Sequence, residues 1–137
     1  MKQSFSFGNI VPLIPALHLD ETIAFYVKEL GFTKIFQDED SGYTGLCRDD
    51  VELHLYKTED QALSKQLAEW TVIRLQTSKI EKLYRILKDK DFLHPNANKI
   101  ELKEYGLKEF SIVDPSGVLI TFYENPRHFG NITAVDF

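Results

Sequence analysis

Apolar and polar side chains alternate along two runs near the end of the chain, with a turn sequence between them. The residues of one parity are large and apolar in both runs: Phe110, Ile112, Ile120 and Phe122. A period of two is typical of strands whose two faces meet different surroundings. The intervening DPSG sequence at 114–117 combines an Asx acceptor, a proline of fixed φ and a glycine that can adopt positive φ. Residues 108–124 therefore predict a β-hairpin.

Apolar residues recur at helical spacing in two other stretches. In the first stretch they are Ile23, Tyr26, Val27 and Leu30, and in the second they are Ile80, Leu83, Tyr84 and Leu87. Such spacing places them on one face of a helix. Asp20 and Ser78 have side chains suited to the N-caps of these helices, and Gly31 is suited to end the first one. We predict two amphipathic helices with these residues at their ends.

The order of predicted elements is the same in two halves of the chain. Each half begins with an apolar strand, continues into a helix and ends in three strands. The opening strand at 10–17 contains Pro12 and Pro15, which lack amide hydrogens and predict a sheet edge. We predict an α+β fold of two βαβββ modules, with the strands curled around a shared cavity. The predicted single domain comprises module one at 10–58, a helix-prone linker at 59–68, module two at 69–125 and a C-terminal tail at 126–137.

Composition and charge narrow the kinds of partner. The 137 residues suffice for one domain with its own core, and 43% of them are hydrophobic. Sixteen Lys and Arg against twenty-one Asp and Glu give a net charge of -5 without a basic block, which argues against nucleic acid and favours a cationic partner. Cys47 is the only cysteine, and no segment has the pattern of a membrane span or signal peptide. We expect a soluble, cytoplasmic protein.

Three segments carry a resemblance to a known family. They are VPLIPALHLDETIAFYVKELGF at 11–32, FQDEDSGYTGLCRDDVELHL at 36–55 and KEFSIVDPSGVLITFYE at 108–124. In this order and spacing, the chain resembles the glyoxalase, bleomycin resistance and extradiol dioxygenase superfamily, also called the vicinal oxygen chelate superfamily. Within it, the chain is most similar to bleomycin resistance proteins. The resemblance implies a dimeric protein that sequesters a drug and so confers antibiotic resistance.

Metal-dependent members of this superfamily carry His, Gln or Glu side chains on the first and last strands of each module. The matching positions here are Val11 or Leu13, His54, Val72 or Trp70, and Thr121. Because a divalent ion needs three or four donors, we expect neither a catalytic metal nor a cofactor. We expect His54 to be a polar residue of the cavity wall. The remaining histidines are expected to be exposed: His18, His94 and His128.

Aromatic residues supply most of the candidate binding site. Four of them fall where bleomycin resistance proteins carry the rings that line the drug crevice: Phe36, Tyr43, Trp70 and Tyr105. Ring faces bind planar and cationic ligands. Further candidates lie on equivalent faces of the last strands of the two modules: His54, Tyr56, Thr121 and Tyr123. The alternative is that these rings pack in the core.

Three classes of function remain open. The one we favour is a non-catalytic protein that binds and sequesters a planar, cationic, bleomycin-like antibiotic. The alternative is an enzyme of the same superfamily, either a metal-dependent glyoxalase-like lyase or isomerase, or a dioxygenase. The third is a domain with a filled cavity and a structural or regulatory role. The resemblance also implies a homodimer, in which we expect the arm carrying Phe5 and Phe7 to exchange between chains.

Overall fold

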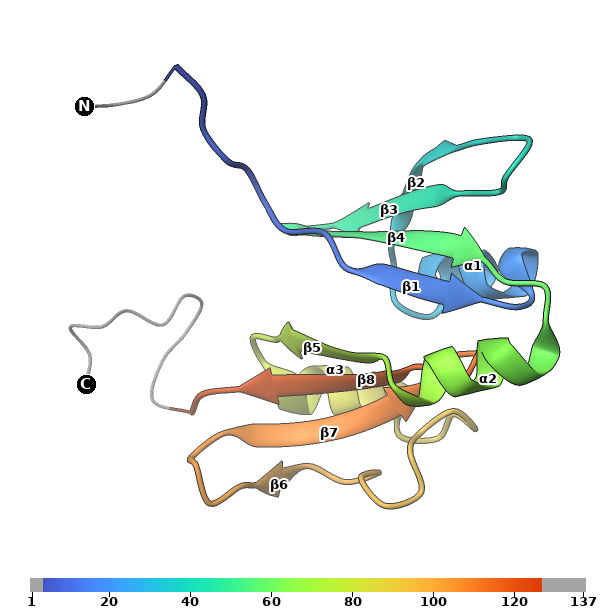
Figure 1. Cartoon of the computed structure of the whole chain (residues 1–137). Helices are drawn as coiled ribbons and strands as arrows, with labels where there is room; N and C mark the ends of the chain where they lie inside the picture. Colours follow the sequence, from blue (N-terminus) through green and yellow to red (C-terminus); the bar gives the residue numbers. More distant parts are fainter. Residues whose placement is uncertain (1–3, 127–137) are drawn as a thin grey trace.

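The β structure consists of two separate four-stranded sheets, drawn one above the other in Figure 1. The computed structural model describes residues 4–126. The first sheet has the order β1-β4-β3-β2, with β1 (Leu13–Ala16), β2 (Thr33–Gln37), β3 (Thr44–Arg48) and β4 (Val51–Lys57). The second has the order β5-β8-β7-β6, with β5 (Val72–Gln76), β6 (Glu101–Leu102), β7 (Lys108–Val113) and β8 (Leu119–Glu124). This confirms the predicted α+β fold with two βαβββ modules.

Strand pairing is the same in both sheets. The first strand of each module runs parallel to the last strand, and the other neighbours are antiparallel. β1 lies at a sheet edge, as its prolines predict. The helices are α1 (Leu19–Lys28) and α3 (Ile80–Leu87), one in each module, and α2 (Gln61–Glu69) between the modules. No helix within residues 4–126 combines the length and apolarity needed to cross a membrane.

Both predicted N-caps are wrong. His18, not Asp20, precedes α1, and the histidine side chain makes no capping bond. Asp20 lies in the first turn, where its negative charge suits the helix dipole. At α3 the cap position is Lys79, not Ser78, and the amides of Lys79 and the next residue donate to the carboxylate of Glu124 at 2.7 and 3.2 Å. A residue distant in sequence thus replaces the local cap.

The predicted hairpin is confirmed as β7 and β8, which pair in the expected antiparallel register. In its turn, the Asp114 carboxylate accepts hydrogen bonds from the amides of Ser116 and Val118, both at 2.9 Å. Gly117 has φ +97°, a conformation that glycine adopts without steric cost. The large apolar residues of both strands are buried on the core side of the sheet. The alternating pattern therefore identified both faces correctly.

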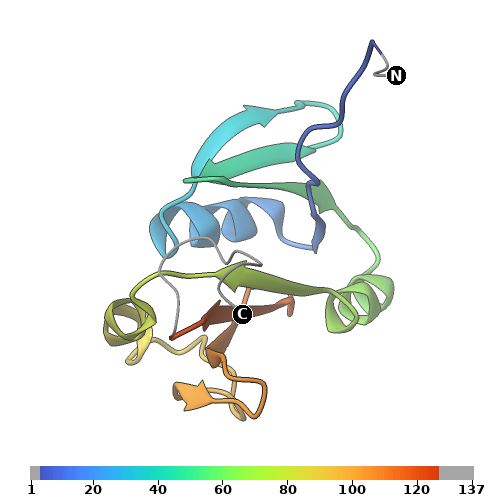
Figure 2. The ribbon, with the colours of Figure 1, turned by 90° about the vertical axis from the view of Figure 1, so that its left-hand side faces the viewer.

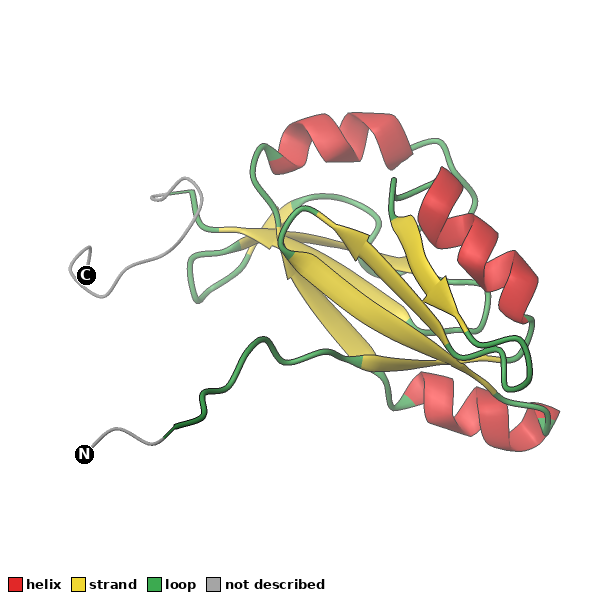
Figure 3. Cartoon of the chain, turned by 90° about the horizontal axis from the view of Figure 1, so that it is seen from above, coloured by secondary structure: helices red, strands yellow, loops and turns green. Residues whose placement is uncertain are grey.

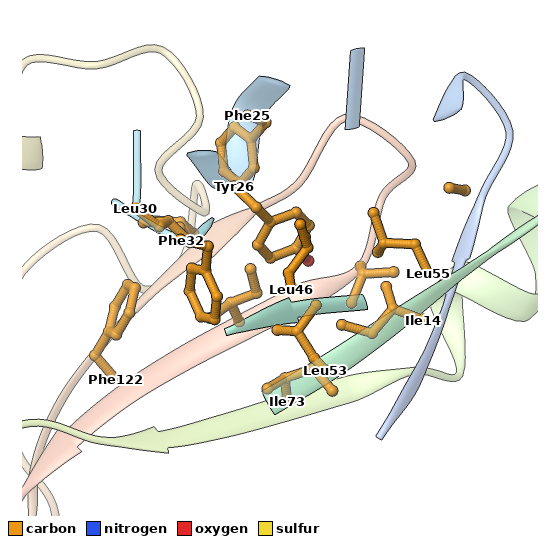
Figure 4. Close-up of a cluster of buried hydrophobic side chains, with 14 of the residues drawn as sticks. Ile14, Phe25, Tyr26, Leu30, Phe32, Leu46, Leu53, Leu55, Ile73 and Phe122 are labelled. Atoms are coloured by element: carbon orange, nitrogen blue, oxygen red, sulfur yellow. The ribbon is translucent and has the colours of Figure 1, made fainter. Parts of the chain in front are cut away.

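One hydrophobic core joins the two modules. α1 lies between the two sheets (Figure 2), and the helices surround the crossing strands when the chain is seen from above (Figure 3). Figure 4 shows Tyr26 of α1 in one cluster with Leu53 of the first sheet and Ile73 of the second. The Tyr26 hydroxyl also donates a hydrogen bond to the buried carboxylate of Asp114 at 2.8 Å. The modules are thus connected by apolar packing and by a buried polar contact.

The described chain before β1 runs away from the sheets (Figure 1). Its apolar side chains are exposed, with Phe7 at 92% and Ile10 at 95% of full exposure. Phe5 contacts Phe7 edge to face at a centroid distance of 5.9 Å. Of the predicted C-terminal tail, residues 127–137, including His128, lie outside the described residues.

Candidate functional site

Each sheet has one face on the shared core and one outer face. Along β4, Leu53 and Leu55 are buried in the core, so the residues that alternate with them lie on the opposite side. Strand register and direct contacts extend this assignment to neighbouring residues. The first outer face comprises Leu13, Phe36, Tyr43, Gly45, Cys47, Glu52, His54 and Tyr56. The second outer face comprises Val72, Arg74, Tyr105, Glu109, Ser111, Thr121 and Tyr123. Trp70 lies at the end of α2, two residues before β5.

The first outer face holds a cluster of aromatic rings around a histidine. His54 is hydrogen-bonded through Nδ1 to the Tyr43 hydroxyl at 2.8 Å and through Nε2 to the Glu52 carboxylate at 2.7 Å. Since an ionised carboxylate only accepts, Nε2 donates to Glu52 and a neutral ring accepts from Tyr43. Phe36 packs edge-on against His54 at 5.1 Å and nearly parallel to Tyr43 at 6.1 Å, with its ring over Gly45. The polar bonds thus fix the orientation of a surface suited to stacking.

The second outer face holds an ion pair enclosed by tyrosines. Arg74 donates to the carboxylate of Glu109 at 2.6 Å, and the Tyr105 hydroxyl donates to the same oxygen at 2.6 Å. The Arg74 guanidinium also lies 4.9 Å from the centroid of the Tyr123 ring, within cation–π range. The arginine is therefore neutralised by a carboxylate and covered on one side by a ring, which leaves the tyrosines to present apolar surface.

The pKa of Glu109 reflects two opposed effects. Burial raises the pKa, but the hydrogen bonds from Arg74 and Tyr105 outweigh it and hold the pKa below the ordinary value of 4.5. In return, the hydrogen bond to Glu109 raises the pKa of Tyr105 above its ordinary value, so its hydroxyl stays protonated at neutral pH. Glu109 is thus an anion at neutral pH, and its ion pair with Arg74 is maintained.

Replacing Glu109 with glutamine should alter the pH dependence of stability. A carboxyl with a depressed pKa stabilises the folded state above its unfolded pKa and loses that contribution as the pH falls through its folded pKa. The free energy of unfolding of the wild type should therefore exceed that of Glu109→Gln at pH 7, and the difference should shrink below pH 4.5. Urea unfolding of both proteins from pH 7 to pH 3 measures this difference. A difference that stays constant over this range would contradict the assignment.

The predicted site residues divide between the two modules. The structure brings Phe36, Tyr43 and His54 into contact, and Tyr56 lies on the same face. Tyr105, Thr121 and Tyr123 belong to the second face, and Trp70 lies in the same module, at the end of α2 before β5. Within residues 4–126, no hydrogen bond or ring contact joins the two groups.

Exposure decides between surface and core for several of these residues. Trp70 is 84% exposed, Tyr105 is 59% exposed and Phe36 is 42% exposed, so the core alternative is wrong for these three rings. Thr121 differs because it is buried and hydrogen-bonded to Ser111 at 2.8 Å. Its side chain supports the sheet beneath the exposed rings.

Sequence reasoning missed the polar partners of the rings. Glu52, Arg74 and Glu109 each bond to a predicted site residue or hold one in place. Glu52 and Glu109 lie on the same strand faces as the predicted site residues. Their position in the alternating pattern was the only feature of the sequence that could have identified them. Gly45 was also missed, since only the structure shows the Phe36 ring resting on it.

Metal donors are sparse around His54. Leu13 pairs with His54 across the first sheet, and its side chain cannot bind an ion. In the second sheet Arg74 pairs with Thr121 and Val72 pairs with Leu119, and neither Arg74 nor Val72 supplies a metal donor. Within the described residues 4–126, no three His, Cys, Asp or Glu side chains converge. Glu52 is the acidic neighbour of His54, and it is engaged in the hydrogen bond that orients the imidazole.

Comparison with known proteins is consistent with this architecture, although no family model matches the chain. A bleomycin resistance protein from Geobacillus stearothermophilus is 24% identical over 127 residues, which cover 83% of this chain and 94% of that protein. A bleomycin resistance protein from Klebsiella pneumoniae is 29% identical over 119 residues, which cover 83% of this chain and 90% of that protein.

A solved structure shows the same arrangement of strands and helices. It is a bleomycin-binding protein in complex with bleomycin, 28% identical, with a TM-score of 0.68 over 87% of this chain and 99% of that chain. The likeness in sequence and in structure extends over both modules, as does the predicted resemblance. In sequence and in structure the chain is therefore similar to bleomycin resistance proteins, which supports the predicted resemblance to the glyoxalase/bleomycin resistance superfamily.

Proposed function

We propose that this protein binds and sequesters bleomycin or a related planar, cationic antibiotic, without changing it chemically. The observation that carries the proposal is the set of exposed aromatic rings, of which Trp70 and Phe36 are examples. Exposed apolar surface of this kind marks interaction sites. The bleomycin-binding relative, whose structure contains bleomycin, supports the same ligand.

Stacking and charge would contribute separately to the affinity. The proposed wall residues are Phe36, Tyr43, His54, Tyr56, Trp70, Tyr105 and Tyr123, with the buried Thr121 beneath them. Flat ring systems of a ligand can stack on the exposed rings, and cationic groups gain from the ring faces. The net charge of -5 attracts a cation from a distance. Arg74 on the second outer face does not oppose this attraction, because its charge is neutralised by Glu109.

We further propose that the crevice forms between two chains of a homodimer. The two groups of wall residues lie on different sheets, so the first outer face of one chain can meet the second outer face of its partner. Exposed Leu13 and Val72 add apolar surface to these two faces. The exposed Phe7 and Ile10 precede β1 and are suited to exchange onto the partner.

The homodimer is a testable expectation. Sedimentation velocity should show a dimer at micromolar concentration, and Phe7→Ser combined with Ile10→Ser should shift the distribution toward monomer, because apolar contact area is lost. Leu63→Ser on α2, which is also exposed but lies outside both outer faces, is the matched control. A wild-type monomer under these conditions would contradict a crevice built from two chains.

Titration with bleomycin tests the ligand. Trp70 is the only tryptophan and is largely exposed, so its fluorescence should change when a ligand covers it.

Trp70→Ala should weaken binding measured by calorimetry by about 1 kcal/mol, at low salt and in 1 M salt alike, because stacking does not depend on ionic strength. The charge contribution should fall as the Debye length shrinks to about 3 Å in 1 M salt. Loss of all binding in 1 M salt would show that charge alone holds the ligand and would contradict the stacking site.

A further inference from the structure

A cavity lies between the two modules. It has a volume of about 370 Å³, and we call it the junction pocket. The first module contributes residues near the end of α1 and the turn between β3 and β4, and the second contributes the segment from β5 into α3. Apolar side chains form part of its lining, among them Leu30, Phe32, Leu75, Leu83 and Phe122, and Gln76, Thr77 and Ser78 line it as well. Figure 4 shows Leu30, Phe32 and Phe122 together at one end of the core cluster.

The charged residues of the junction pocket are predominantly basic. Arg48, Lys79 and Lys82 line it, against Asp49 as the acidic residue. Within residues 4–126, neither lysine has a carboxylate partner. The acidic neighbours of α3 are engaged elsewhere, since Glu81 binds Lys108 and Glu124 accepts the amides at the helix start. A locally positive pocket in a chain of net charge -5 is complementary to an anion.

Arg48 is held in place at this site. Its Nη1 donates to the carbonyl of Leu30 at 2.6 Å, and its Nε lies 3.5 Å from the carboxylate of Asp49. Arg48 is thus partly neutralised. The unpaired positive charges of the pocket are therefore those of Lys79 and Lys82.

Backbone strain is also located at the junction pocket. Within the described chain, Asp49 and Lys79 are the non-glycine residues with positive φ, at 53° and 54°, and both line this cavity. Glycine adopts this conformation without a steric penalty, yet the chain has a lysine at the start of α3. Glu124 fixes the strained backbone by accepting the Lys79 amide at 2.7 Å. Residues in such uncommon backbone conformations are found most often at functional sites, where the surrounding structure holds them in place.

We infer that the junction pocket binds a small amphipathic carboxylate of the medium-chain fatty acid type. The alkyl chain would lie against the apolar side chains of the lining, and the carboxylate would accept hydrogen bonds from Lys79 and Lys82. The volume is near the lower end of the range for small-molecule sites, which fits a single short chain better than a drug-sized molecule. A cation such as bleomycin is disfavoured here by the two lysines, so this site is independent of the outer faces.

Calorimetry with decanoate below its micelle concentration tests the inference on the 137-residue chain. We expect saturable binding of one decanoate per chain. Decylammonium has the same alkyl chain and the opposite charge, and it should bind at least about tenfold more weakly. Equal binding of the two amphiphiles, or no saturable binding of decanoate, would overturn the inference.

Variants separate the lysines from general charge effects. Lys79→Gly should weaken decanoate binding about tenfold while leaving the thermal stability unchanged or higher, because glycine relieves the positive φ. Lys82→Met should weaken binding to a similar extent. Lys65→Met, on the exposed surface of α2, is the matched control and should have no effect. Equal weakening by all three variants would show that the overall charge, and not the junction pocket, attracts the anion, and would overturn the site.

Discussion

Replacing Asp114 with alanine is expected to lower the free energy of unfolding by about 3 kcal/mol or more. The carboxylate of Asp114 accepts hydrogen bonds from the Tyr26 hydroxyl and from the amides of Ser116 and Val118, and it is 4% exposed. Alanine leaves these donors without their acceptor in a place that water reaches poorly. Urea unfolding followed by circular dichroism measures the loss.

Two further variants show how much of this loss of stability comes from the turn amides and how much from the Tyr26 hydroxyl. Asp114→Asn keeps a side-chain oxygen of the same reach and should cost clearly less than alanine. Tyr26→Phe removes only the hydroxyl that joins the modules and should cost about 1 kcal/mol. If alanine and asparagine were equally destabilising, the turn amides would not be the main partners of this carboxylate.

Asp114 should also respond to pH in the sense opposite to Glu109. Burial raises the pKa of Asp114, and the hydrogen bonds from Val118, Tyr26 and the turn amides only partly offset it, so the pKa stays above the ordinary value of 3.8. A raised carboxyl pKa means that the folded state holds the proton more tightly. The resulting stabilisation is full below pH 3.8 and is lost as the pH rises through the folded pKa.

The second large effect is expected at Gly45. A Cβ at this position would overlap the ring of Phe36, which must then leave its place beside Tyr43 and His54. Gly45→Ala should weaken bleomycin binding about tenfold to a hundredfold, because several ring contacts worth about 1 kcal/mol each are disturbed together. The stability should change little, since Phe36 is exposed enough to rotate outward and alanine suits a strand better than glycine.

A double-mutant cycle checks that Gly45 acts through Phe36. In a Phe36→Leu background the smaller side chain can give way, so adding Gly45→Ala should cost little more affinity for bleomycin. Calorimetric titrations of the four proteins supply the cycle. An affinity unaffected by Gly45→Ala alone would mean that the Phe36 cluster is not part of the ligand wall.

Local patterns predicted the elements well where local chemistry determines them. The hairpin followed from alternation and from the turn residues Asp114 and Gly117, whose roles are the predicted ones. The helix starts did not follow, because the cap of α3 is Glu124, which is 44 residues from Ile80 in sequence. A local search for caps cannot detect a carboxylate supplied by another strand.

The candidate site was predictable only in part. Strand parity predicted that Tyr56 shares a face with His54 and that Tyr123 shares a face with Thr121, since alternation is a property of each strand alone. The structure shows that these faces lie on the side of each sheet opposite the core. The pairing of Arg74 with Glu109 depends on which strands are neighbours, a feature that emerges only in the folded sheet. The division of the rings between two sheets likewise depends on tertiary structure.

The most direct test of sequestration is recovery of the bound ligand. The protein should be dialysed to equilibrium against bleomycin, and the retained ligand should then be released by denaturation and weighed by mass spectrometry. Stoichiometric retention of bleomycin at micromolar concentration, with its mass unchanged after prolonged incubation, is the predicted result. A bleomycin product of altered mass, or no retention alongside turnover of a glyoxalase-type thiol adduct, would contradict a binding protein and indicate an enzyme.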